Sequence, residues 1–361
     1  MGTEVVFWTV VLARFGVPLL IPRWPLPAIL GALVLDAADQ TIFQAFGYDP
    51  PNYQSYDKAM DVFYLSIAYL ASLRNWSNLH AVKVSRFLFF YRQVGTVLFE
   101  LTGARWLLLV FPNTFEYFFI AYEGIRSRRN PLRYSLRFWV LVAAGIWIFI
   151  KLPQEYWIHI AELDFTDTVR DVPWFGPAVV IGLLALAAVL WFVVRPRLRP
   201  PDWPLRLPAD PLPTAIDEAS ERAAYRAAHG KVFGWAALEK TFLIGLISVI
   251  YGRVLPGVNV SDLQLFLGIA FFVVINSAIG LWAARRGYGW DSAAISFGVV
   301  FGINVGIVLL ENLLLSRRGD GLSLVDTFFF IFLISILTML YDRYHPVNQY
   351  RTAAARNKVT P

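Results

Sequence analysis

Four aspartates in two consecutive apolar stretches are the residues of this sequence best suited to chemistry. Asp36 and Asp39 are three residues apart and Asp57 and Asp61 are four apart, so each pair is expected on one face of a helix. Two facing carboxylate pairs supply the oxygen ligands that Mg²⁺ or Mn²⁺ prefers, and they can also carry protons. The alternative interpretation is structural, with each carboxylate neutralised by a nearby arginine.

The spacing of these aspartates resembles the motif of the CDP-alcohol phosphotransferases. That family carries Asp-x₂-Asp-Gly-x₂-Ala-Arg and then Gly-x₃-Asp-x₃-Asp on two consecutive membrane helices. All four aspartates match in position, whereas the glycine and Ala-Arg positions hold other residues: Gln40, Phe43, Gln44 and Tyr53. The resemblance implies a divalent-metal centre that acts on a CDP-linked donor, and it covers residues 36–61 only.

Arg92 and Glu116 form a second charged pair, in the apolar stretches 83–101 and 105–124. Both side chains are expected near mid-membrane, since the two helices run antiparallel and rise about 1.5 Å per residue. The pair is interpreted either as structural neutralisation or as a site where Arg92 grips a phosphate or carboxylate with its planar guanidinium. The predicted ion or substrate pathway consists of Asp36, Asp39, Arg92 and Glu116.

Glu155, His159 and Glu162 fall on one face if the segment around them is helical. An imidazole between two carboxylates can bind Zn²⁺, Mn²⁺ or Fe²⁺, and it can also act in general acid–base catalysis. An amphipathic helix at the membrane interface explains the same pattern. The sequence therefore offers two candidate metal sites: the four aspartates, with Mg²⁺ or Mn²⁺ as the cofactor, and this second group.

The composition shows what kind of solvent must surround these charges. Of the 361 residues, 57% are hydrophobic and only 16% are charged, whereas soluble domains average about 25% charged. A soluble surface cannot hide so much apolar area, but a lipid bilayer can. The net charge of +6 comes largely from arginines in short loops, a pattern that orients membrane proteins, so nucleic acid is not expected as a partner. The expected partners are the bilayer and an anionic small molecule, lipid or ion.

The elements that must position the charged residues are transmembrane helices. A span needs about 20 apolar residues, and the backbone must be helical because lipid offers it no hydrogen-bond partner. About eleven stretches qualify or nearly qualify. They are 4–22, 25–46, 57–74, 83–101, 105–124, 137–152, 174–194, 233–252, 262–284, 291–315 and 322–342. Arg14 and Pro18 make the first of these the weakest.

Charge in the loops predicts the orientation and the organisation. The most basic loop, 126–133, is expected in the cytoplasm together with the C-terminus, and the acidic loop 152–173 outside. The expected location is a cell membrane of plasma-membrane type. The predicted order is seven spans in 1–194, a Pro-rich cytoplasmic linker with a short amphipathic helix in 195–231, four spans in 232–342, and a basic tail in 343–361.

Three functions are compatible with this all-α, polytopic membrane protein. The first is a transporter or ion-coupled channel whose polar route passes the intramembrane charges. The second is a membrane enzyme with a divalent-metal carboxylate site for a lipid-linked or phosphorylated substrate. The third is a non-catalytic scaffold or subunit whose buried charges are only paired with one another. The chain has no cysteine, which excludes thiolate metal sites and cysteine nucleophiles.

Overall fold

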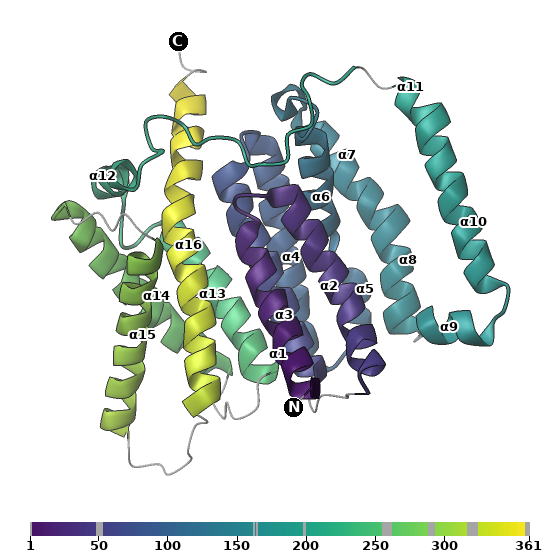
Figure 1. Cartoon of the computed structure of the whole chain (residues 1–361). Helices are drawn as coiled ribbons and strands as arrows, with labels where there is room; N and C mark the ends of the chain where they lie inside the picture. The colour runs from purple at the N-terminus through teal and green to yellow at the C-terminus, as the bar shows by residue number, and fades with distance from the viewer. Residues whose placement is uncertain are drawn as a thin grey trace.

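The computed structural model describes residues 2–47, 53–161, 163, 165–197, 200–254, 262–287, 293–315 and 324–357. Within these residues the chain is a bundle of helices without a strand, and 82% of it is helical. The all-α prediction is confirmed. Figure 1 shows the long helices running side by side, with short helices and connecting segments at the two ends of the bundle.

The helices follow one another in the order of the chain. The N-terminal helices are α1 (Gly2–Gly16), α2 (Pro25–Ala45), α3 (Tyr53–Asn75), α4 (Leu79–Thr102), α5 (Trp106–Val110), α6 (Thr114–Arg126), α7 (Leu136–Ile146), α8 (Leu152–Glu155), α9 (Phe165–Asp171), α10 (Phe175–Ala188) and α11 (Arg195–Arg197). The C-terminal helices are α12 (Ala219–His229), α13 (Trp235–Val254), α14 (Asp262–Arg285), α15 (Ala293–Leu315) and α16 (Leu324–Asn357). Short 3₁₀ turns lie at Val17–Leu20 and Pro131–Arg133, and π-helical segments at Trp147–Lys151, Tyr156–Ile160 and Val189–Val194.

Five helices among the described residues are long and apolar enough to cross a membrane. They are Pro25–Phe43, Leu136–Ile160, Trp235–Arg253, Phe266–Arg285 and Phe328–Asn357. Three shorter apolar helices, Val5–Leu20, Phe175–Ala185 and Ala293–Gly306, coincide with further predicted spans. The structure therefore supports a multispanning protein, and the predicted number of about eleven spans is not reached by these criteria.

The three remaining predicted spans form the interior of the bundle. The stretches 57–74 and 83–101 lie in α3 and α4, and 105–124 is divided between α5 and α6 around Pro112. Helices α1, α2, α4, α6, α13 and α16 all pack against α3. Neighbouring helices enclose α3 from Val62 to Leu73, whereas Asp57, Lys58 and Asp61 lie nearer its start and are 37%, 45% and 40% exposed.

Aromatic side chains fill the centre of this bundle. Trp76 at the end of α3 stacks on Tyr122 of α6 with ring centroids 3.8 Å apart, and Tyr69 stacks on Phe89 of α4 at 4.5 Å. Trp139 of α7 closes the same cluster and is fully buried. The core thus joins α3, α4, α6 and α7, and α6 brings three buried charged residues to it: Glu116, Glu123 and Arg126.

The Pro-rich linker crosses one end of the bundle, at the top of Figure 1. Its backbone N–H groups at Asp202, Arg206 and Ala209 donate to carbonyls of Arg128, Ser127 and Arg23. The linker is therefore hydrogen-bonded to the bundle. Its short helix begins after Glu218, which forms a capping box with Glu221, and ends at Gly230.

The two ends of the bundle agree with the predicted separation of charge. The basic loop 126–133, the linker, α12 and the C-terminal end of α16 lie at one end, and α9 in the acidic loop lies at the other (Figure 1). The last helix, α16, continues as far as Asn357, so most of the predicted basic tail is helical.

Candidate functional site

A single guanidinium is surrounded by the four predicted aspartates. Arg14 donates from Nη2 to Asp36 at 2.5 Å and to Asp61 at 2.6 Å, and from Nη1 to Asp57 at 2.7 Å and to Asp39. We refer to these five residues as the Arg14 cluster. One positive charge and four negative charges leave it with a formal charge of −3.

The first three helices position this cluster by their spacing. Helix α2 presents Asp36 and Asp39 on one face, and α3 presents Asp57 and Asp61 on one face, as the sequence predicts. Arg14 is in the last turn of α1, which packs against both α2 and α3. At about 1.5 Å per residue, Asp36 lies roughly 16 Å from the start of α2, near the middle of that helix.

The cluster is closed on one side and open on the other. The side chains of Arg14 and Asp39 are 2% and 4% exposed, whereas those of Asp36, Asp57 and Asp61 are 28%, 37% and 40% exposed. A proton or cation can therefore approach three of the four carboxylates. Asp39 lies deeper and holds the guanidinium in place.

A second group of buried polar residues begins one turn further along α3. Tyr64 lies three residues after Asp61 and close enough for the charges of Asp61 and Asp36 to act on it. Its hydroxyl donates to Glu116 of α6 at 2.6 Å. Tyr64 thus connects the Arg14 cluster to Glu116, which is itself only 3% exposed.

The break between α5 and α6 lies beside Glu116. Pro112 cannot donate a backbone hydrogen bond, so the helix stops there and leaves backbone groups without helical partners. Buried charged residues satisfy them: Arg92 donates to the Phe111 carbonyl at 2.9 Å, and the Asn113 N–H donates to Glu155 at 3.2 Å. Non-helical backbone at membrane depth is tolerated only with such partners or beside a cavity.

A π-helical distortion brings a lysine to the same place. Lys151 ends the π segment Trp147–Lys151 and is 3% exposed, with its Nζ 4.0 Å from Glu116 and 4.1 Å from the Tyr117 ring centroid. π segments inside helices are frequent at functional sites. Within the part of the chain that the structure describes, Lys151 is the cation that forms an ion pair with Glu116.

The predicted Glu155–His159–Glu162 group is found in part. His159 Nε2 lies 3.1 Å from Glu155, within the π segment Tyr156–Ile160, whereas Glu162 is outside the described residues. Glu155 also lies 4.0 Å from Arg92. It therefore belongs to the network around the α5–α6 break and does not face water as an interfacial helix would.

The predicted contact between Arg92 and Glu116 is replaced by other pairs. Arg92 donates to the Phe111 carbonyl and lies 4.0 Å from Glu155. Glu116 accepts hydrogen bonds from Tyr64 and Asn113 and lies 4.0 Å from Lys151. The reason is the break at Pro112, which turns the start of α6 away from the line of α5. The four pathway residues nevertheless lie in two adjoining groups.

Sequence reasoning missed the central cation and two connecting residues. The sequence pattern identifies Arg14 only as a charge that weakens the first predicted span. One arginine in an apolar helix nevertheless requires a carboxylate partner, and four carboxylates lie on the next two helices. Lys151 gave the same signal, as a lone lysine at the end of an apolar stretch. Tyr64 gave no signal, because tyrosines are common in this chain.

The donor set fits a divalent cation only if the guanidinium moves. Carboxylate oxygens of Asp36, Asp39 and Asp57 lie within 4.8 Å of one another, a spacing that a hard cation can bridge. Arg14 donates to each of them and occupies the space between them. In this arrangement the carboxylates form ion pairs with the guanidinium of Arg14.

No protein-family model, no curated protein and no solved structure matches this chain significantly. The resemblance to CDP-alcohol phosphotransferases is therefore carried by the four aspartates alone.

Proposed function

We propose that this protein is a proton-coupled membrane transporter in which the Arg14 cluster binds protons. The observation that supports this most is the imbalance of one guanidinium against four carboxylates within a helix bundle. Excess negative charge in a low-dielectric site favours binding of protons or cations. A set of residues that served only to neutralise one arginine would need fewer acids.

Protonation of the cluster is expected to loosen α1. Nη2 of Arg14 is held by Asp36 of α2 and Asp61 of α3, so protonation of these two carboxylates weakens the attachment of α1, whereas a proton on Asp57 mainly relieves the repulsion among the acids. The helix ends at Gly16 and continues as a 3₁₀ turn that contains Pro18, which gives α1 a natural hinge. Proton binding and helix movement are thereby coupled.

The substrate route is expected at the α5–α6 break. Discontinuous helices at mid-membrane commonly form the substrate sites of secondary transporters. The side-chain oxygen Oδ1 of Asn113 is buried there without a donor among the described residues. Tyr64 links this break to the Arg14 cluster, so a change of charge at one site is felt at the other.

The test uses the absence of native cysteine. Val11 lies one turn before Arg14 and is 5% exposed, whereas Leu12 is 66% exposed. We expect the rate at which a Val11→Cys thiol reacts with a water-soluble maleimide, corrected for thiolate fraction, to rise as the pH falls from neutral to acidic, because α1 separates from α2 and α3. The rate at Leu12→Cys, corrected for thiolate fraction, should change little, and Asp36→Asn or Asp61→Asn should abolish the pH dependence at Val11→Cys.

A Val11→Cys rate that follows thiolate fraction alone would contradict the proposal, as would a pH dependence that survives both aspartate substitutions. Transport itself is then assayed by proton movement into liposomes in the presence of candidate solutes.

A second candidate function rests on the close approach of three carboxylates. If Mg²⁺ or Mn²⁺ displaces Arg14, the cluster becomes the metal centre of an enzyme for a lipid-linked or phosphorylated substrate. Saturable thermal stabilisation by either ion, lost in Asp36→Asn, would favour this function, and CDP-linked substrates would be tested next. The scaffold function requires neither a metal response nor a pH response.

We further propose a cell membrane as the location, with the linker end of the bundle in the cytoplasm. The basic residues of loop 126–133 support this orientation.

A further inference from the structure

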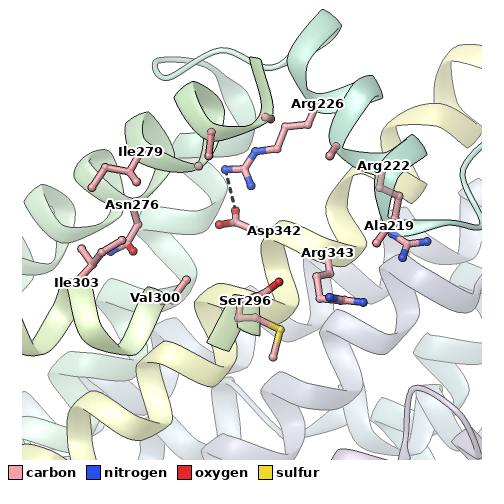
Figure 2. A pocket seen from close by; sticks show the side chains of 15 residues that line it. Ala219, Arg222, Arg226, Asn276, Ile279, Ser296, Val300, Ile303, Asp342 and Arg343 are labelled. Carbon is pink, nitrogen blue, oxygen red and sulfur yellow. Dashed lines mark ion pairs between the residues drawn. The ribbon is translucent and has the colours of Figure 1, made fainter. Parts of the chain in front are cut away.

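A pocket lies far from the Arg14 cluster in sequence, between α12, α14, α15 and α16. Figure 2 shows arginines from α12 and α16 gathered at one side of it, while Ile279, Val300 and Ile303 line the other. Its open volume, including the part that faces solvent, is about 750 Å³. The pocket thus has a charged end and an apolar end.

The charged end carries more cations than the neighbouring carboxylate can neutralise. Asp342 pairs with Lys240 at 2.9 Å and with Arg226 at 3.5 Å, so two cations already share it. Among the described residues Arg222 donates to the backbone carbonyls of Ile216 and Asp217, at 3.0 and 2.6 Å, and to no carboxylate. These carbonyls orient the guanidinium, and the charge of Asp217 also acts on it, without an ion pair between the two among the described residues.

Arg343 completes the positive end. Among the described residues it has no ion-pair partner, and its charge acts on both Arg222 and Arg74. Burial, followed by the charges of Arg343 and Arg74, lowers the pKa of Arg222. Arg222 and Arg343 line the pocket, Arg74 lies near enough for its charge to act on Arg222, and a bound anion would relieve the repulsion among the three.

From the position of α12 at the linker end of the bundle, we expect the charged end of the pocket at the membrane surface. The helix lies across the end of the bundle, begins in a capping box at Glu218 and projects Arg222 and Arg226 over the transmembrane helices (Figures 1 and 2). Interfacial helices with basic faces meet anionic lipid headgroups at this level, and basic pockets between transmembrane helices bind them.

Gly280 makes room for the basic side chain of α12. A Cβ built at this position would lie 2.8 Å from Nη2 and 3.2 Å from Cζ of Arg226. The guanidinium therefore rests on the backbone of α14. This contact holds Arg226 beside Asp342, while Arg222 and Arg343 line the pocket without an ion pair to any carboxylate of the described residues.

The apolar end continues between α14 and α15 toward the membrane interior. The lining of α14 extends from Asn276 to Ala284, which spans about 12 Å along the helix axis. Asn276 is 5% exposed, and its Oδ1 has no donor among the described residues. That length accommodates a glycerol unit and the beginning of an acyl chain, with Oδ1 available to a hydroxyl donor.

We propose that this pocket binds an anionic glycerophospholipid, with its phosphate on Arg222 and Arg343 and its acyl chains between α14 and α15. A free phosphate would satisfy the arginines alone. The lipid also accounts for the apolar continuation and for the location at the membrane surface. The site does not depend on the transport mechanism proposed above.

The experiment measures lipid binding to the purified full chain in detergent. Phosphatidylglycerol, phosphatidylcholine with the same acyl chains, glycerol 3-phosphate and inorganic phosphate are titrated separately, and thermal stability gives the apparent affinity. We expect saturable stabilisation by phosphatidylglycerol alone. Arg222→Gln and Arg343→Gln should each weaken it about tenfold. Arg137→Gln, an exposed arginine at the start of α7 outside the pocket, should not change it.

Native mass spectrometry of the wild type provides a measurement that does not depend on the variants folding. After exposure to an equimolar mixture, the protein should retain phosphatidylglycerol in preference to phosphatidylcholine. Equal stabilisation by the two lipids, or unchanged affinity in both arginine variants, would overturn the proposal. Equal saturation by inorganic phosphate would also overturn it, and would assign a site for a soluble phosphate.

Discussion

At the level of single residues, the charge count of the Arg14 cluster decides how substitutions there should behave. Arg14 neutralises part of the negative charge of all four carboxylates, whereas each carboxylate is only one of four ion-pair partners of Arg14. The arginine and the aspartates are therefore unequal in importance for stability. The usual expectation, that either partner of a buried ion pair is equally costly to remove, does not apply.

Arg14→Gln should be strongly destabilising and Asp57→Asn should not. Without the guanidinium, four carboxylates remain together, and breaking a buried ion pair by removing one partner costs about 3–5 kcal/mol. Without Asp57, which is 37% exposed, the remaining acids repel one another less and Arg14 keeps three partners. Thermal unfolding in lipid nanodiscs measures both. A larger loss of stability in Asp57→Asn than in Arg14→Gln would contradict this description of the cluster.

The sequence predicted the acids of the site better than their partners. The periodicity of a helix places Asp36 with Asp39, and Asp57 with Asp61, without any knowledge of the fold. The identity of the cation depends on which helix packs against α2 and α3, and α1 was not expected to contribute. Tyr64 and Lys151 contact Glu116 because of tertiary packing, which a single sequence does not reveal.

At the level of the helices, the break between α5 and α6 depends on one close approach. Gly95 of α4 faces Phe111, just before Pro112, and a Cβ at Gly95 would lie 2.1 Å from the Phe111 Cβ. Only a glycine allows α4 to approach the break so closely. The same approach brings Arg92, one turn earlier on α4, to the Phe111 carbonyl.

Gly95→Ala should therefore displace the break and destabilise the protein by about 1–3 kcal/mol. Gly124→Ala is the matched control, because a Cβ at Gly124 meets nothing within 4 Å, and alanine in an exposed helix position is neutral or stabilising by up to about 1 kcal/mol. Thermal unfolding of the two variants is compared. Equal stability of the two would show that the α4–break contact is not as close as described.

The helical stretches were predicted well by hydrophobicity, and their role as membrane spans less well. A window of apolar residues cannot distinguish a helix that faces lipid from one enclosed by other helices. Helix α3 contains Asp57, Lys58 and Asp61 and is nevertheless the most enclosed helix of the bundle. The break at Pro112 was not predicted because the apolar residues continue on both sides of it.

At the level of the whole molecule, the helices before and after the linker share one core. Helices α13 and α16 both pack against α3, and the end of α16 is tied to it, since Arg351 donates to the carbonyls of Arg74 and Trp76 at 2.7 and 3.1 Å. The sequence predicted two groups of spans from the polar linker between them. It could not show that the later helices complete the surroundings of α3.

Glu239 of α13 is the residue through which this joint core can be tested. It is buried and accepts hydrogen bonds from the Tyr69 hydroxyl and, at 3.1 Å, from Nε of Arg86, so it connects α13 with α3 and α4. Glu239→Leu removes the acceptor of the Tyr69 hydroxyl and the counter-ion of Arg86, which keeps only its contact with the Tyr69 hydroxyl at 3.2 Å, and should cost about 3 kcal/mol. Arg86→Leu combined with Glu239→Leu should cost less than the two single changes together, because the second change no longer leaves an unpaired charge. The measurement is thermal unfolding of the four proteins in nanodiscs, and all should unfold in one transition. Additive losses, or separate transitions for the two groups of helices, would mean that the later helices are only attached to the outside of the bundle.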